Sequence, residues 1–94
     1  MRIILCCGAH GRAVVIGDVA REPTPGKAVK LNNARMVLWW DKACGGLLGL
    51  AASGPKGGTR ITASVPWVRE TKWQECVAVT DSAAEAIDAW PAHK

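Results

Sequence analysis

Glycine, proline and asparagine divide this chain into short apolar runs, and this punctuation constrains the fold more than any other feature. The 94 residues include ten glycines and five prolines. Most runs between them have the length of strands and are too short for an amphipathic helix. The sequence therefore predicts a mainly β fold of the α+β class. We expect a small antiparallel sheet or partly closed barrel of about six strands.

The expected strands follow one another with turn residues between them. Residues 2–7 and 12–19 flank the turn 8–11 and form a predicted hairpin. After the proline-bearing loop 21–26, further strands are expected at 27–31, 35–40, 47–52, 59–65 and 73–79. The double glycine 45–46 lets 47–52 pair with 35–40, and the glycine-rich segment 54–58 reads as a hairpin loop. Both faces of 35–40 are largely apolar, so we expect both to be covered.

The period of the pattern changes near the C-terminal end of the sequence. An apolar stripe with spacing i, i+3, i+4 and i+7 begins at Ala83 and ends at Trp90. Ser82 and Glu85 fit a capping box, and a proline follows Trp90. The sequence predicts one C-terminal helix over 81–90, docked onto the sheet through Trp90, within a single domain spanning 1–94.

Positive charge is concentrated in the body of the chain. Twelve Lys and Arg residues against eight Asp and Glu residues give a formal net charge of +4. Residues 26–60 contain six of these basic residues and a single acid, Asp41. Such an imbalance favours anionic partners, namely nucleotides, nucleic acid or an acidic protein surface. A solvated basic surface without a specific partner is the alternative.

Neither catalytic nor metal chemistry is indicated by the cysteines, histidines and acids. The four cysteines form no CxxC motif and are expected to be free thiols in a reducing cytosol. Cys7 and His10 have C-x-x-H spacing, but Cys44 and Cys76 complete a four-ligand site only through tertiary proximity. We therefore expect no metal site and no cofactor. No nucleophile–base pair or carboxylate pair is evident, so we expect a protein that is not an enzyme and has no catalytic residues.

The central block suggests a binding site for a flat anionic ligand. Tryptophan stacks on bases, arginine and lysine contact phosphate, and asparagine reads a base edge. The glycine-rich segment lacks the GxxxxGK[ST] motif, so a simple turn is the alternative to an anion nest there. Trp40 is expected to be core or a subunit contact, whereas Trp39 remains a candidate. The candidate ligand-binding residues are Asn33, Arg35, Trp39, Lys56 and Arg60.

A family resemblance rests on a motif that runs through this block. The chain carries K-L-N-N-A-R at 30–35, then Trp40, Gly46, G-L-A-A-S-G-P at 49–55, Gly58 and R-I at 60–61. This pattern resembles a family of small uncharacterised proteins of tailed phages and prophages. The chain departs from it in Trp39, where tyrosine is usual, and in its Cys6-Cys7 start. The resemblance covers about two thirds of the chain and implies a phage origin, a host-cytoplasmic location and an accessory role.

Three functions are compatible with these observations. The first is a homo-oligomeric counter-defence protein that captures a nucleotide-like signal or blocks a host defence protein complex. The second is a nucleic-acid-binding accessory in phage recombination or replication. The third is a purely structural role, in which the small residues of the G-L-A-x-x-G-P signature pack subunits closely. No run of transmembrane length is present, so we expect no membrane partner.

Overall fold

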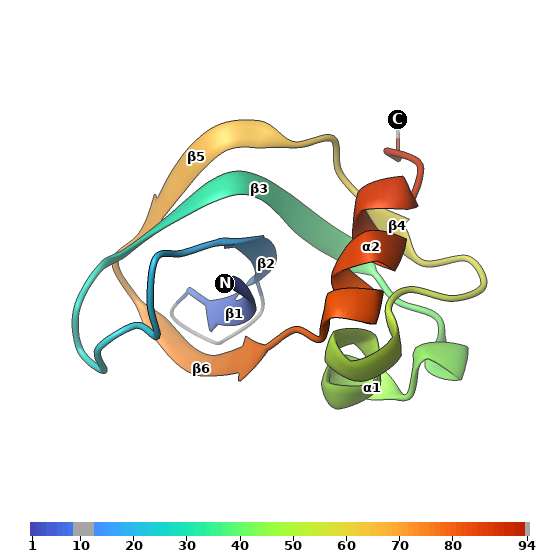
Figure 1. Cartoon of the computed structure of the whole chain (residues 1–94), viewed down its shortest axis with the longest axis horizontal. Coiled ribbons are helices and arrows are strands. Elements are labelled where there is room, and N and C mark those ends of the chain that lie inside the picture. The colour runs from blue at the N-terminus through green and yellow to red at the C-terminus, as the bar shows by residue number, and fades with distance from the viewer. Residues whose placement is uncertain (9–12, 94) are drawn as a thin grey trace.

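A single curved sheet with two short helices at one end makes up the fold (Figure 1). The computed structural model describes residues 1–8 and 13–93. The elements are β1 (Arg2–Cys7), β2 (Ala13–Asp18), β3 (Val29–Trp39), η1 (Lys42–Cys44), α1 (Gly46–Ser53), β4 (Arg60–Ile61), β5 (Val65–Glu70), β6 (Trp73–Ala78) and α2 (Asp81–Ala89). The prediction of a mainly β fold with a C-terminal helix is confirmed.

All strand pairs in the six-stranded sheet are antiparallel. The order is β4-β3-β2-β1-β6, and β5 also pairs with β3. β4 and β5 thus occupy successive lengths of the same edge of β3. Within the described residues no ladder joins β5 to β6, although only Thr71 and Lys72 separate them along the chain. The sheet is therefore curled but not closed into a barrel.

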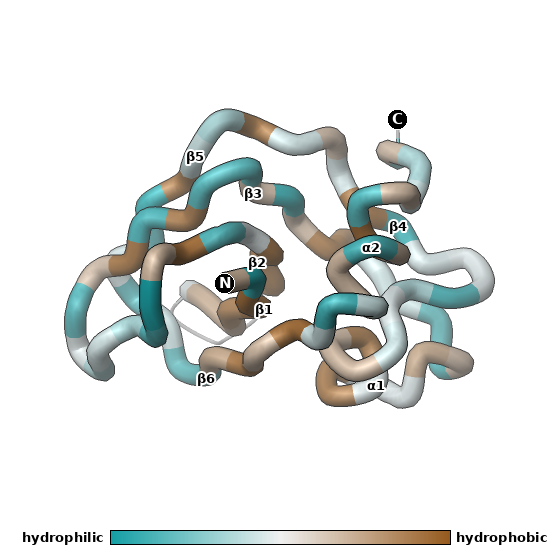
Figure 2. The backbone as a smooth tube through the Cα atoms, viewed as in Figure 1, coloured by the Kyte–Doolittle hydropathy of each residue, from teal (hydrophilic) through white to brown (hydrophobic). Residues whose placement is uncertain are grey.

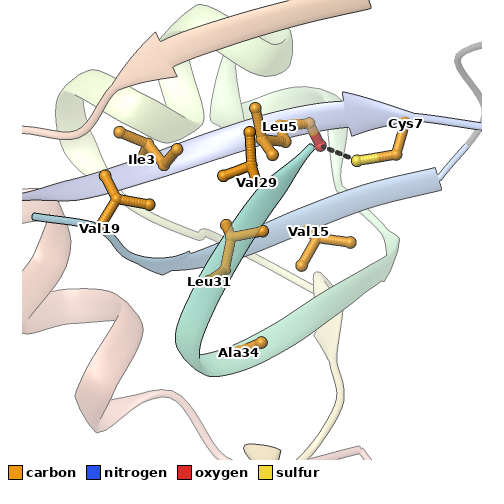
Figure 3. Close-up of a cluster of buried hydrophobic side chains, with 8 residues drawn as sticks. All are labelled: Ile3, Leu5, Cys7, Val15, Val19, Val29, Leu31 and Ala34. Carbon is orange, nitrogen blue, oxygen red and sulfur yellow. Dashed lines mark hydrogen bonds between the residues drawn. The ribbon is translucent and has the colours of Figure 1, made fainter. Parts of the chain in front are cut away.

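β1 is buried on both faces and divides the apolar residues into two cores. The inner core contains Ile3, Leu5, Val15 and Leu31, and partly buried residues of β5 and β6 pack against it (Figure 3). Because all five long strands contribute, the sheet curls around this cluster. The outer core contains Ile4, Val14, Ile16 and Ile61, together with buried residues of α1 and α2. Figure 2 shows the apolar colouring of β1 at the centre of the molecule.

The predicted hairpin and the last predicted strand both exist. β1 and β2 pair from Arg2–Asp18 to Cys7–Ala13. β6 ends one residue before the expected boundary at Val79. Residues 9–12, which include His10, lie outside the described part of the chain. The suggested Cys7–His10 pair is therefore not described.

A bulge joins two of the predicted strands into one. The segments 27–31 and 35–40 belong to the single strand β3, and Asn33 does not form a turn. Asn33 has φ 51°, and the β2–β3 register shifts there, because Ile16 faces Arg35 while Asp18 faces Asn32. Asparagine tolerates the left-handed region better than other non-glycine residues, so it accommodates the extra residue of a β-bulge.

The predicted strand 47–52 is wrong, since these residues form α1. The run is uniformly apolar and has no alternation that distinguishes a strand from a buried helical turn. Gly49 lies so close to η1 that a Cβ atom there would sit 1.8 Å from the carbonyl oxygen of Cys44. Gly54 ends the helix with φ 86° and donates its N–H to the Leu50 carbonyl. The glycines of the signature thus serve close packing within the chain.

Two further predictions fail after α1. Residues 54–58 link α1 to β4 and do not form a hairpin loop between strands. The expected strand 59–65 is interrupted, because β4 contains only Arg60 and Ile61 and β5 begins at Val65. Ile61 is buried, whereas Ala63 and Val65 are exposed. The face of β3 around Met36 and Leu38 is also exposed, contrary to the expectation that both faces are covered.

α2 matches the predicted C-terminal helix, with a different N-cap. Thr80, and not Ser82, caps it by accepting a hydrogen bond from the Ala83 N–H. Ala83 and Ile87 are fully buried, and the Trp90 indole donates to the carbonyl of Thr59 at 2.9 Å. No helix in the described part of the chain is long and apolar enough to cross a membrane.

Candidate functional site

The structure separates the five sequence-predicted ligand residues into two groups. Asn33 and Arg35 line a hollow of about 470 Å³ between β3 and the C-terminal end of α2. Trp39 and Arg60 lie directly opposite each other on β3 and β4. Lys56 lies in the loop before β4, where its backbone N–H contacts the Cys44 Sγ atom. No single hollow contains all five residues.

Arg35 has a structural role in this arrangement. Its guanidinium donates to the carbonyl oxygens of Thr62, Ile87 and Trp90. Two of these contacts reach carbonyls at the end of α2, where the Ile87 carbonyl also accepts the C-cap hydrogen bond from the Trp90 N–H. Burial lowers the pKa of Arg35, although the charge of Asp88 acts in the opposite direction. Three of the five N–H donors of this guanidinium are thus engaged within the protein.

The hollow beside Arg35 is also balanced in charge. Arg2 donates to Asp18 at 2.7 Å and to Asp88 at 2.8 Å. Burial alone would disfavour the charged form of Arg2, but these hydrogen bonds outweigh it and raise its pKa. The Asn33 amide contacts Asp18 at 3.4 Å. Two arginines and two aspartates thus offset one another, which leaves little attraction for an anionic ligand.

Trp39 and Arg60 form an exposed corner at the end of β3. The β3–β4 register shifts between Val37 and Trp39, so Trp39 shares the face of Arg60 and lies opposite the face of Val37 and Ile61. Trp39 is 51% exposed. Within residues 1–8 and 13–93, both cation–ring contacts involve Trp67 and neither involves Trp39.

A stronger site lies around Trp67 on β5, where two cations meet one indole. The Lys30 Nζ atom lies 5.1 Å from the centroid of the Trp67 ring, and the Arg69 Cζ atom lies 5.5 Å from it. Lys30 and Arg69 are direct partners across β3 and β5, and Asn32 faces Trp67 on the neighbouring pair. Trp67 is 51% exposed. We call Lys30, Asn32, Trp67 and Arg69 the Trp67 platform.

Strand alternation places these four side chains on one face. Val29 and Leu31 of β3 enter the inner core, so Lys30 and Asn32 point to the outer face. Val68 packs against the same core, and its neighbours Trp67 and Arg69 therefore point outward with them. Both cations come from the same cross-strand pair, so they reach the indole from one end of β5. The side of the ring toward Asn32 and the bulge is left without a cation.

A second basic hollow adjoins the Trp67 platform through Lys30. This hollow has a volume of about 500 Å³ and is formed by the loop between β2 and β3. Arg21, Lys27 and Lys30 line it, against one acid, Glu22. In the described residues the two salt bridges both belong to Arg2, so these cations have no carboxylate within salt-bridge distance there. The hollow and the platform share an excess of positive charge.

The thiols of Cys6, Cys7 and Cys76 lie in surroundings that suppress reactivity. Burial, aided by the charges of Glu70 and Cys6, raises the pKa of Cys7 to about 12. Burial also raises the pKa of Cys6 and Cys76. Among the described residues no group of three or more His, Cys, Asp or Glu side chains could hold a metal ion.

Sequence reasoning missed Trp67 and Arg69 because the predicted strands 59–65 and 73–79 do not include them. β5 lies at an edge of the sheet and pairs only with β3, and an edge strand tolerates proline. The alternation of Trp67, Val68 and Arg69 is the signal that identifies this strand. The pairing with Lys30 could not be read from the sequence, since it depends on the β3–β5 register.

Comparison with known proteins adds a family but no activity. The family model described as "Domain of unknown function (DUF6948)" matches residues 1–90. No curated protein and no solved structure matches the chain.

Proposed function

The chain belongs to the DUF6948 family, and we propose that it binds single-stranded nucleic acid through the Trp67 platform. A base stacks on the Trp67 indole, while Lys30 and Arg69 contact the phosphate on one side of it. Nucleic-acid binding is one of the three functions compatible with the sequence. The stacking residue is now Trp67, in place of the sequence candidate Trp39.

The observation that supports this proposal is the pair of like charges, Lys30 and Arg69, that both contact the Trp67 ring. Lys30 and Arg69 face each other directly across the sheet, with no carboxylate within salt-bridge distance in the described residues. Like charges in this position destabilise a sheet. The Trp67 ring relieves part of the repulsion, because its face attracts cations. A bound phosphate would relieve it further, so the pair is better suited to a ligand than to stability alone.

The geometry favours a single strand over a duplex. Stacking on a protein ring requires an unpaired base, and the half-exposed Trp67 offers such a surface. Asn32 lies on the adjacent position and carries both a donor and an acceptor for a base edge. The basic hollow of Arg21, Lys27 and Lys30 lies where the next phosphate along the strand can be held. Binding should therefore weaken as salt rises, because released counterions drive it.

The test compares two tryptophans of equal exposure. Binding of a fluorescently labelled oligo-dT is measured by anisotropy for the wild type, Trp67→Ala and Trp39→Ala, since both rings are 51% exposed. Trp67→Ala should weaken binding by about 5- to 150-fold, which corresponds to the loss of one stacked base. Trp39→Ala should bind as the wild type does.

The opposite ranking, or no binding by the wild type at low salt, would refute the proposal. Circular dichroism and thermal melts of both variants establish that the fold is retained. Lys30→Ala provides a second test. The slope of log K against log salt concentration should become less steep by about 0.7, which corresponds to the loss of one phosphate contact.

A nucleotide-sized ligand is the second candidate, and the basic hollow favours it. Its volume of about 500 Å³ is within the usual range of small-molecule sites. In this form the protein is the proposed counter-defence factor, which captures a nucleotide-like signal in the host cytoplasm as a homo-oligomer. The family resemblance supports that setting, and nothing in the geometry selects a host target.

Ligand length separates the two candidates. A single-strand binder should gain affinity from a dinucleotide to an oligonucleotide and then depend steeply on salt. A protein that encloses one small ligand should bind mono- and dinucleotides as tightly as longer strands, with fixed stoichiometry. Native mass spectrometry of protein purified from cells reports subunit number and any retained small molecule together.

A further inference from the structure

The loop between β2 and β3, which forms the basic hollow, offers backbone donors as well as positive charge. Residues 19–28 have no regular secondary structure. Within the described part of the chain, the N–H groups of Arg21, Glu22 and Thr24 donate to no backbone carbonyl. All three residues line the hollow. Backbone N–H groups around a concavity are a common form of anion site.

Two contacts hold this loop in place. The Lys27 N–H donates to the Thr24 carbonyl at 3.1 Å and closes a turn, in which Gly26 has φ 82°. The indole of Trp73 on β6 donates to the Lys27 carbonyl at 2.8 Å. The hollow is therefore formed before a ligand arrives, which reduces the entropy lost on binding.

The positive charge of the hollow exceeds what one phosphodiester requires. Arg21, Lys27 and Lys30 are exposed and, against Glu22, leave a net charge of +2. Glu22 is half-buried and also lines a smaller cavity beside Cys76. Burial, aided by the charge of Glu22, raises the pKa of Cys76, so this carboxylate acts partly on the inner core. A phosphodiester carries one negative charge, whereas a terminal phosphate carries about 1.5 to 2 at neutral pH.

The hollow also lies where a bound strand would leave the protein. The loop is at the end of the molecule away from α1 and α2 (Figure 1). Lys30 connects the hollow to the platform, because it lines the hollow and its Nζ atom lies 5.1 Å from the Trp67 ring centroid. We propose that the hollow binds the terminal phosphate of a nucleic-acid strand that stacks a base on Trp67. This inference rests on the proposed function and specifies which part of the strand is selected.

The geometry requires a preference for one end of the strand. Trp67 and the loop have fixed relative positions, and a nucleic-acid strand has a direction. Only one direction therefore places the terminal phosphate in the hollow while a base lies on the indole. A phosphate at the 5′ end and one at the 3′ end carry the same charge, so a preference between them cannot arise from charge alone.

The test compares oligo-dT strands of one length that carry a 5′-phosphate, a 3′-phosphate or a hydroxyl at both ends. Each unlabelled strand displaces a fluorescent oligo-dT from the full chain, and anisotropy reports the displacement. One of the two phosphorylated strands should bind at least about tenfold more tightly than the other two strands. Equal affinity of all three strands, or an equal gain from either phosphate, would overturn the inference. Displacement by inorganic phosphate at the concentration where the preferred strand acts would also overturn it, because the hollow would then bind a free anion.

Substitutions assign the preference to the hollow. Arg21→Ala and Lys27→Ala should each reduce the preference between the two ends by about fivefold. Lys42→Ala is the matched control, because Lys42 is an exposed cation of η1 outside the hollow, and it should keep the full preference. An equal reduction in Lys42→Ala would contradict the assignment. The comparison of strands with the wild type decides the question even if a variant fails to fold.

The same titrations separate this inference from the proposed function. If the hydroxyl-ended strand does not bind, or binds equally well to Trp67→Ala, both fail. If that strand binds through Trp67 and neither end is preferred, only the terminal-phosphate inference fails.

Discussion

The Arg35 guanidinium donates a hydrogen bond of 2.9 Å to the carbonyl oxygen of Trp90, so β3 holds the C-terminal end of α2 directly. The same side chain reaches the carbonyls of Ile87 and Thr62. One residue therefore joins the sheet, the helix and the segment between β4 and β5. The phosphate-binding role first suggested for Arg35 competes with this use of its donors.

Replacing Arg35 should affect stability more than any loss of ligand contact. Arg35→Ala removes three hydrogen bonds and disconnects the end of α2 from β3, although the Ile87 carbonyl keeps its bond from the Trp90 N–H. We expect a loss of about 2–4 kcal/mol in the free energy of unfolding. For a domain of this size each 1 kcal/mol corresponds to about 4–8 °C in Tm. Urea titration and thermal melts provide the measurement.

Arg60→Ala is the control for this change. Arg60 is exposed and makes no salt bridge within the described residues. Its removal should alter the free energy of unfolding by no more than about 0.5 kcal/mol. Equal losses in the two variants would mean that Arg35 is not the specific connection described here.

Gly49→Ala should be among the most damaging single changes in α1. The added methyl would lie 1.8 Å from the Cys44 carbonyl oxygen, so η1 or α1 must move. We expect a loss of more than about 2 kcal/mol, despite the better helix propensity of alanine. Leu48→Ala in the same helix serves as comparison, because Leu48 is 66% exposed and its loss should be nearly neutral. A stabilised Gly49→Ala protein would contradict the close packing.

Acid should weaken the fold through Asp18. Burial acts to raise the pKa of Asp18, but hydrogen bonds from Arg2 and Asn33 outweigh it and lower the pKa. Its stabilisation is therefore present above the unfolded value of about 3.9 and is lost as pH falls through the lower folded value. Asp18→Asn should cost up to about 1 kcal/mol at pH 7, a figure reduced for solvent screening. The difference from wild type should shrink as pH falls through the lowered folded pKa of Asp18.

Urea denaturation at a series of pH values measures this difference. Added salt at pH 7 should reduce it, because the Asp18 side chain retains 35% exposure. A difference that persists unchanged at pH 2 would assign the effect to packing and not to charge.

Cys7 should resist alkylation while the protein is folded. Its raised pKa of about 12 leaves almost no thiolate at pH 8, and its side chain is fully buried. Iodoacetamide should label Cys7 at least about a hundredfold more slowly than it does in urea, as read by peptide mass spectrometry. Labelling of native Cys7 at the denatured rate would show that β1 opens readily at its end.

Regular patterning was sufficient to predict some elements of this fold. The β1–β2 hairpin follows from two apolar runs around a glycine-bearing turn, and α2 follows from its helical stripe and terminal proline. In both segments local propensity and tertiary contacts favour the same structure. The boundaries there match the prediction or differ from it by one residue.

The errors arise where tertiary contacts decide between two local structures. Residues 47–52 are uniformly apolar, so only the packing of Gly49 against η1 distinguishes helix from strand. The Trp67 platform depends on the pairing of Lys30 with Arg69, residues that are far apart in sequence. A bulge at Asn33 and another register shift before Trp39 determine which face each later side chain occupies. None of these registers has a local sequence signature.

The position of β1 between β2 and β6 has a consequence for biosynthesis. Ile3 and Leu5 emerge from the ribosome long before β6, the strand that completes their enclosure, has been translated. Until β6 is available, the β1–β2 hairpin exposes aggregation-prone apolar surface and leaves one edge of β1 unpaired. Cotranslational protection of the nascent β1–β2 segment, by a chaperone or by fast completion of synthesis, should therefore govern the yield of native protein.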